Sequence, residues 1–156
     1  MAAQQGILGP VVKSEAVLAV ADVAATLKFY REKLGFTKEW FWDDPPTDGG
    51  VQFGKVELSF HLDPDLAKHV EGQQYDFFVT NIDDLYVRHQ QAGVLIVSPL
   101  ERKQWGMREY TITDPNGYHL RFGEPFGPIR AESSPKRHIS TTSRGRSWSG
   151  QKNADK

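Results

Sequence analysis

The feature that most constrains the fold of this chain is an internal repeat with a period near 60 residues. Residues 15–20 and 74–79 are strand-like segments, and each precedes a segment whose apolar residues recur at helical spacing. Val20 and Val79 hold corresponding places 59 positions apart. Such a period is too long for the common solenoid repeats, so the sequence predicts a duplicated half-domain.

Each half follows the order strand, helix, strand, strand, strand. The expected strands are 15–20, 37–42, 51–54 and 55–62 in the first half, and 74–79, 94–97, 107–113 and 118–123 in the second. Asp22 and Asn81 precede the helices, which are expected to end near Gly35 and Gly93. Residues 43–50, including both glycines, are expected to form a loop.

This order predicts an α+β fold of two βαβββ modules, about 13–62 and 74–125. Each module is expected to form a curved, mixed or antiparallel sheet with its helix on the outer face. The concave face then needs a cover, which the other module, a second subunit or a ligand could supply, and we expect the groove to be completed in a dimer. Strand alternation assigns the following residues to the concave groove: Glu15, Glu57, Ser59, His61, Gln74, Asp76, Phe78 and Arg121.

Charge divides the chain at about residue 127. Residues 128–156 hold seven Lys/Arg against two Asp/Glu and few large apolar side chains, so we interpret them as a disordered basic tail. Residues 1–127 form the expected domain and are mildly acidic, which suits a cationic ligand. The tail alone is weak support for a nucleic-acid partner, and we do not expect one.

Composition sets further bounds on the class of protein. The chain has no cysteine, and therefore no disulfide framework and no Cys-type zinc site. No apolar run reaches the roughly 20 residues of a membrane helix, and the N-terminus lacks the pattern of a secretory signal. We therefore expect a cytoplasmic protein without a membrane partner.

Aromatic side chains gather in the segment Trp40-Phe41-Trp42. Three consecutive aromatic residues cannot all face one side of a strand, so at least one faces the groove or an interface. Exposed Trp and Tyr often bind planar ligands or cations, although ordinary sheet packing is an equal alternative. Trp105 and Tyr110 are candidates for the same surface.

The segments AVLAVADVAATLKFYREKLGF, YDFFVTNIDDLYVRHQQAGV and DPNGYHLRF together resemble the vicinal oxygen chelate superfamily. That superfamily includes glyoxalases, extradiol dioxygenases and bleomycin-resistance proteins. The segment KQWGMREYTITDPNG is most similar to the bleomycin-resistance type. The resemblance implies a homodimer that holds a cationic glycopeptide in grooves between subunits, without chemistry.

Metal-dependent members of the superfamily bind their ion through four inward-facing positions. By resemblance these positions fall on Glu15, Ser59, Gln74 and Arg121. A fixed guanidinium, an amide and a hydroxyl are poor partners for a divalent ion, so we expect no metal and no cofactor. Glu15 and Arg121 are instead expected to form an ion pair in the space that a metal would occupy.

The leading hypothesis is a metal-independent binding protein of the bleomycin-resistance type. It would sequester a cationic or planar small molecule, with a glycopeptide antibiotic as candidate. One alternative is a metal-dependent lyase or dioxygenase with a shifted site around Glu57 and His61. Another is a regulatory interaction module that uses the basic tail.

Overall fold

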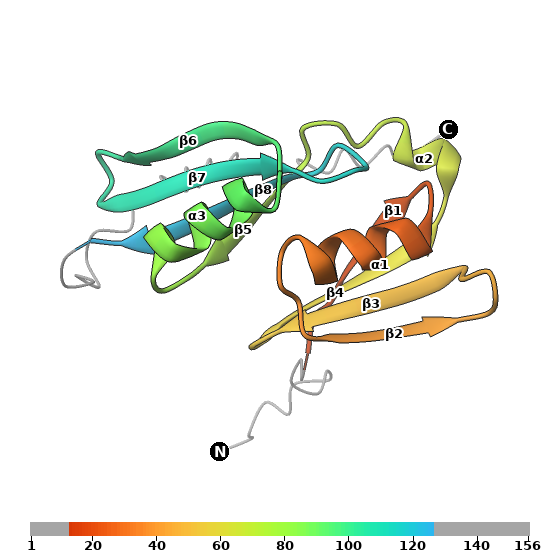
Figure 1. The fold of residues 1–156 in the computed structure, drawn as a ribbon. Coiled ribbons are helices and arrows are strands. Elements are labelled where there is room, and N and C mark those ends of the chain that lie inside the picture. The colour runs from red at the N-terminus through yellow and green to blue at the C-terminus, as the bar shows by residue number, and fades with distance from the viewer. Residues whose placement is uncertain (1–12, 127–156) are drawn as a thin grey trace, which may run out of the picture.

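The computed structural model describes residues 13–126, which form two similar modules (Figure 1). Module 1 comprises β1 (Ala16–Val20), α1 (Val23–Glu32), β2 (Lys38–Trp42), β3 (Asp48–Phe53) and β4 (Val56–Leu62). Module 2 comprises β5 (Gln74–Phe78), α3 (Ile82–Gln91), β6 (Ile96–Arg102), β7 (Met107–Thr113) and β8 (His119–Pro125). The short helix α2 (Pro64–Ala67) lies between them in sequence. The predicted basic tail, 128–156, lies outside the described residues.

Both modules have the same sheet topology, which confirms the predicted α+β duplication. The strand orders are β1-β4-β3-β2 and β5-β8-β7-β6. In each sheet the first strand runs parallel to the last strand of its module, and the other pairs are antiparallel. Each module is therefore a mixed sheet that carries one helix on one face (Figure 1). No helix within residues 13–126 is long and apolar enough to cross a membrane.

The prediction that Gly49 and Gly50 belong to a loop is wrong, because both lie inside β3. Their missing side chains have a packing role. A Cβ on Gly49 would approach Leu27 of α1 to 3.0 Å, and a Cβ on Gly50 would overlap the indole of Trp40. The two glycines thus let α1 approach one face of the strand and Trp40 cover the other.

The predicted strand at 94–97 is also displaced, because β6 begins at Ile96 and continues to Arg102. Pro99 lies within it, although proline is normally confined to strand ends, bulges and sheet edges. The strand tolerates this proline because it is at the sheet edge, and its pairing with β7 is interrupted by register shifts.

The two helices begin differently, although the repeat predicts equivalent caps. The carboxylate of Asp22 accepts the N–H of Ala25 at 2.9 Å, as expected of an N-cap. Asn81 adopts a left-handed conformation and makes no side-chain cap. The carboxylate of Glu124, on β8, instead accepts the N–H groups of Asn81 and Ile82 at 2.7 and 3.4 Å.

The helix sides of the two modules share one apolar core. Tyr30 of α1 is fully buried, and Phe36 of module 1 meets Phe77 of module 2 edge-to-face at 6.4 Å between ring centroids. Leu58 and Phe60 are buried on the helix side, as alternation predicts. Because the modules pack through these sides, their concave faces point away from the shared core.

The turn Asp114-Pro-Asn-Gly117 fastens module 2 to module 1. The Asp114 carboxylate accepts the Tyr30 hydroxyl at 3.1 Å and the N–H groups of Asn116 and Tyr118, both at 2.9 Å. The Asn116 side chain accepts the N–H of Ala21 at 3.1 Å and donates to the Thr26 hydroxyl at 3.0 Å. The turn is therefore an inter-module contact, not only a reversal before β8.

His89 of α3 makes the stability of the fold sensitive to acid. Burial lowers the pKa of this histidine from 6.5 to about 4, and the Tyr110 hydroxyl bonds its Nδ1 at 2.9 Å. A depressed pKa contributes stability above pH 6.5 that is lost as pH falls toward 4. The difference corresponds to about 3 kcal/mol.

We therefore expect the free energy of unfolding of the natural chain to fall by about 3 kcal/mol more than that of His89→Gln between pH 7 and pH 4. Chemical denaturation at both pH values measures this difference. His69 is exposed, so His69→Gln serves as the control. Its free energy of unfolding should fall between the two pH values as that of the natural chain does. Parallel losses in the natural chain and His89→Gln would contradict the assignment.

Candidate ligand-binding faces

The concave face of module 1 presents three aligned rows of side chains. The strand registers place Val17, Ser59, Gly50 and Trp40 in one row. Ala19, His61, Asp48 and Trp42 form the next row. Glu57, Gln52 and Lys38 form the third. Glu57, Ser59, His61, Trp40 and Trp42 thus lie on one surface, as the sequence predicts.

Glu15 enters this face just before β1 and is held by two partners. Its carboxylate accepts the hydroxyl of Ser59, and Lys13 lies 3.2 Å away. The Ser59 hydrogen bond, followed by that of Lys13, lowers the pKa of Glu15. Lys13 also pairs with Glu57 at 2.5 Å. Lys13, which sequence reasoning missed, therefore links the two predicted carboxylates.

His61 pairs with Asp48 and not with Glu57. Its Nδ1 lies 2.7 Å from an Asp48 carboxylate oxygen, and this contact lowers the pKa of Asp48. Glu57 and His61 are four positions apart on one strand, a separation of roughly 13 Å between their backbones. The prediction that they form one shifted metal or acid–base site is therefore wrong for a single chain.

Trp40 and Trp42 give the face its aromatic surface. Trp40 covers Gly50 and remains 39% exposed, whereas Trp42 is 68% exposed beside the His61–Asp48 pair. Phe41 pairs with Gly49 and lies on the opposite side, near Leu27 of α1. The expectation that consecutive aromatics divide between the two faces is confirmed.

We expect Gly50→Ala to displace Trp40. The new Cβ would meet the Trp40 indole at 2.4 Å and the Leu58 carbonyl oxygen at 2.9 Å, and the backbone atom cannot move away. Overpacking of this kind costs about 1–3 kcal/mol. The tryptophan emission spectrum should shift, and the free energy of unfolding should fall.

Gly54→Ala is the control for this change. Gly54 has φ +59° and open space around it, so alanine there adds backbone strain of about 1 kcal/mol without touching a tryptophan. Unchanged emission and stability in Gly50→Ala would show that Trp40 does not cover Gly50.

The concave face of module 2 contains a chain of polar contacts. Arg121 donates to the Asp76 carboxylate at 2.5 Å and lies 3.9 Å from that of Glu109. Gln74 donates to Asp76 at 2.9 Å, and the Trp105 indole donates to Glu109 at 3.0 Å. The Asp76 hydrogen bond raises the pKa of Arg121 further above its ordinary value. Arg121 is thus a fixed cation held between two carboxylates.

Phe78 extends from the same face and is 79% exposed, so this surface is also partly apolar. Tyr110, in contrast, does not reach the groove. It is buried under α3, where it stacks on Phe122 and bonds His89. The prediction for Tyr110 is wrong because β7 turns this position toward the helix. Its neighbour Glu109 therefore faces the groove, and alternation applied to β7 would have identified it.

The predicted ion pair between Glu15 and Arg121 does not form within the chain. Arg121 pairs with Asp76 and Glu109, and Glu15 with Lys13. The two residues belong to different modules, whose concave faces point away from the shared core.

The four positions used by metal-dependent relatives do not fit a divalent ion here. They provide one carboxylate, one hydroxyl, one amide and one guanidinium, and the guanidinium would repel the ion. Across residues 13–126, no three His, Asp or Glu side chains gather in an arrangement suited to a metal. We therefore derive no metal-dependent step from these residues.

The fold and the two concave faces place the chain in a known class. Residues 13–122 match the model of the Glyoxalase/Bleomycin resistance protein/Dioxygenase superfamily, and the chain belongs to this family. A virulence protein of Salmonella typhimurium is 30% identical over 111 residues, which cover 65% of this chain and 75% of the relative. An uncharacterized protein of Mycobacterium bovis is 38% identical over 54 residues, only 36% of its own length.

Solved structures share the fold at lower identity. The bleomycin-binding protein of Streptomyces verticillus, complexed with copper(II)-bleomycin, has a TM-score of 0.60 and 23% identity. The match covers 74% of this chain and 97% of that one. A glyoxalase-related enzyme from Clostridium phytofermentans has a TM-score of 0.64 and 23% identity, covering 76% and 98%. These similarities establish the fold for this chain, and they include both a binding protein and an enzyme-related protein.

Proposed function

We propose that this protein binds a cationic or planar small molecule, without a metal, in a groove lined by its concave faces. The observation that carries the proposal is the pair of exposed indoles, Trp40 and Trp42, beside an acidic surface. Indoles bind planar rings by stacking and cations through their π face. Desolvated contacts of this kind contribute most of the affinity in many binding sites.

The charge of the faces supports a cationic ligand. The carboxylates are Glu15, Asp48, Glu57, Asp76, Glu101 and Glu109, whereas the cations beside them are Lys13, Lys38, Lys103 and Arg121. Several of these groups neutralise one another in pairs, and the excess is negative. A ligand with an ammonium or guanidinium group therefore gains electrostatically on entering the groove.

A second copy of the chain is proposed to complete the groove. Val17 and Phe78 lie on different concave faces and are 65% and 79% exposed. Val17 shares its face with the exposed indoles of Trp40 and Trp42, and apolar surface gathered on one face commonly marks an interface or a binding site. The two concave faces of one chain point apart. A second copy related by a two-fold axis would therefore place the concave face of module 1 of one copy against the concave face of module 2 of the other. Residues from both modules would then border one ligand.

The donors already described support the proposed metal independence. Glu15 is held by Ser59 and Lys13, and Arg121 by Asp76 and Glu109. Ligand affinity should therefore be insensitive to chelation. A cationic glycopeptide of the bleomycin type is the proposed ligand, in agreement with the copper(II)-bleomycin complex of the Streptomyces relative.

Calorimetric titration of the full chain with a bleomycin-type glycopeptide tests this function. We expect saturable binding with the same dissociation constant before and after treatment with EDTA, which should be removed before titration. The metal-free drug should be used so that chelation acts only on the protein. Absence of heat at high micromolar drug would contradict the proposed ligand, and loss of binding after EDTA would contradict metal independence.

A further inference from the structure

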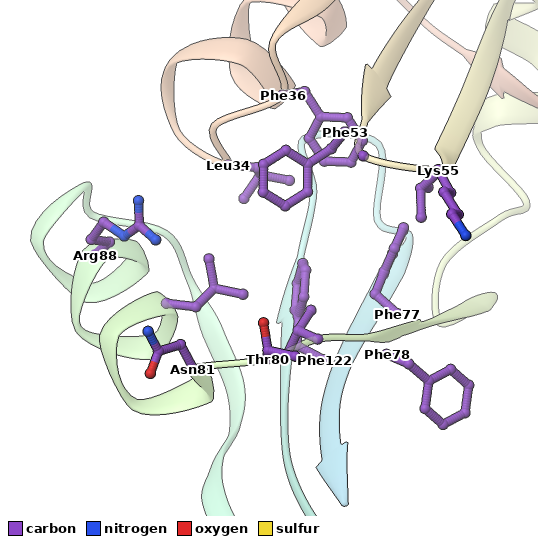
Figure 2. Close-up of a pocket in the computed structure, with 14 residues that line it drawn as sticks. Leu34, Phe36, Phe53, Lys55, Phe77, Phe78, Thr80, Asn81, Arg88 and Phe122 are labelled. Carbon is purple, nitrogen blue, oxygen red and sulfur yellow. The ribbon is translucent and has the colours of Figure 1, made fainter.

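A second pocket lies between the modules, on the helix side of both sheets. Its volume is about 560 Å³, which is within the range of small-molecule sites. The apolar wall combines side chains from both modules: Leu34, Phe36, Phe53, Phe77, Leu85 and Phe122. Figure 2 shows Leu34, Phe36 and Phe53 on one side of the pocket and Phe77 and Phe122 on the other. Apart from Phe78, none of the predicted groove residues borders it.

The charged side chains at this pocket are all cationic. Arg88 of α3 and Lys55, between β3 and β4, border it from opposite sides (Figure 2). No Asp or Glu lines the pocket. Neither Arg88 nor Lys55 forms an ion pair with a carboxylate of residues 13–126. By contrast, Arg31, in the corresponding last turn of α1, pairs with Glu39.

The Arg88 end of the pocket continues into a smaller crevice of about 270 Å³. Arg88, Lys33 and His89 line this crevice, and Glu32 is its one carboxylate. His89 is 1% exposed, and its Nε2 reaches hydrogen-bond geometry with no described residue. The side-chain amide of Asn81, which borders the larger pocket, makes no helix-capping hydrogen bond. Because Lys33 donates to the Ala92 carbonyl oxygen at 2.8 Å, Arg88 is the cation at this end that remains open to a ligand.

We propose that the pocket binds an elongated apolar carboxylate, whose carboxylate group pairs with Arg88 and whose hydrocarbon part lies between Phe53 and Phe77. A guanidinium matches a carboxylate geometrically and can bind it through two parallel hydrogen bonds. The six apolar side chains then remove the hydrocarbon part from water. The site is separate from the proposed groove, whose excess charge is negative and whose ligand is cationic.

Dodecanoate and 1-dodecanol are suitable probes because they share the hydrocarbon chain and differ in the charged group. Calorimetry on the full chain, below the critical micelle concentration, should show dodecanoate binding at one per chain. The alcohol should bind at least about tenfold more weakly, because the charge-assisted hydrogen bonds to Arg88 are lost. Arg88→Gln should weaken the binding of dodecanoate by a similar factor and leave the binding of 1-dodecanol unchanged.

Two controls locate the site. Arg31→Gln removes an arginine from the last turn of α1 and should leave dodecanoate binding unchanged. The double variant Trp40→Ala/Trp42→Ala should also leave it unchanged, although it removes the proposed drug-binding surface. The proposal is overturned if the full chain does not bind dodecanoate, or if Arg88→Gln binds it as the natural chain does. Loss of dodecanoate binding in the tryptophan double variant would place the dodecanoate site on the concave face, and this result would also overturn the proposal.

Discussion

Asp114→Ala is expected to destabilise the protein by about 3–5 kcal/mol, the largest effect that we expect of any single substitution. The change leaves the N–H groups of Asn116 and Tyr118 without their acceptor, and the buried Tyr30 hydroxyl loses its partner. Each unsatisfied buried group costs about 1–3 kcal/mol. Because these bonds join the two modules, chemical denaturation should report the loss as a lower free energy of unfolding.

Asp114→Asn is the matched control. An asparagine oxygen can still accept the two backbone N–H groups, and its amide can donate to the Tyr30 oxygen, so we expect a loss of only about 1 kcal/mol. Burial raises the pKa of Asp114, so its contribution is greatest at low pH and falls as pH rises through that raised pKa. The difference in free energy of unfolding between the natural chain and Asp114→Asn should therefore become smaller toward neutral pH. Equal destabilisation by alanine and asparagine would contradict a hydrogen-bonding role.

The double variant Trp40→Ala/Trp42→Ala is expected to weaken binding of the glycopeptide at least about 100-fold. Removing an indole from a binding surface commonly costs about 2 kcal/mol or more, and two indoles line the same face. Both side chains are partly exposed, so the fold should survive their removal. Calorimetric titration measures the change in dissociation constant.

Phe41→Ala provides the control because Phe41 lies between the two tryptophans in sequence but points to the α1 side. It should retain the drug affinity of the natural chain. Weaker binding in Phe41→Ala than in the tryptophan variant would mean that the ligand contacts the helix side. In that case the concave face would not be the drug site.

The duplication could be predicted from the sequence because its signal is periodic and occurs twice. The faces of the strands followed from alternation, and burial of Leu58 and Phe60 agrees with it. The errors in the fold have local causes. Gly49 and Gly50 resemble a loop, yet their small size allows α1 and Trp40 to pack on β3. Pro99 interrupts a strand pattern, yet an edge strand tolerates it.

The candidate site was less accessible to sequence reasoning, because partners depend on which faces meet in space. The sequence placed Arg121 in the groove but could not show that the parallel pairing of β5 and β8 brings Asp76 beside it. It paired Arg121 with Glu15, which requires the concave faces of the two modules to meet, and within one chain these residues have other partners. The actual packing through the helix sides depends on Tyr30, Asp114 and Phe77, whose contacts are spread over many positions of the sequence.

The proposed arrangement of two chains around a metal-free groove is tested most directly by native mass spectrometry of the full chain, purified without chelator. We predict a dimer that carries no stoichiometric metal and that gains mass when the bleomycin-type drug is added. A monomer at micromolar concentration, or one divalent ion per chain, would contradict the account.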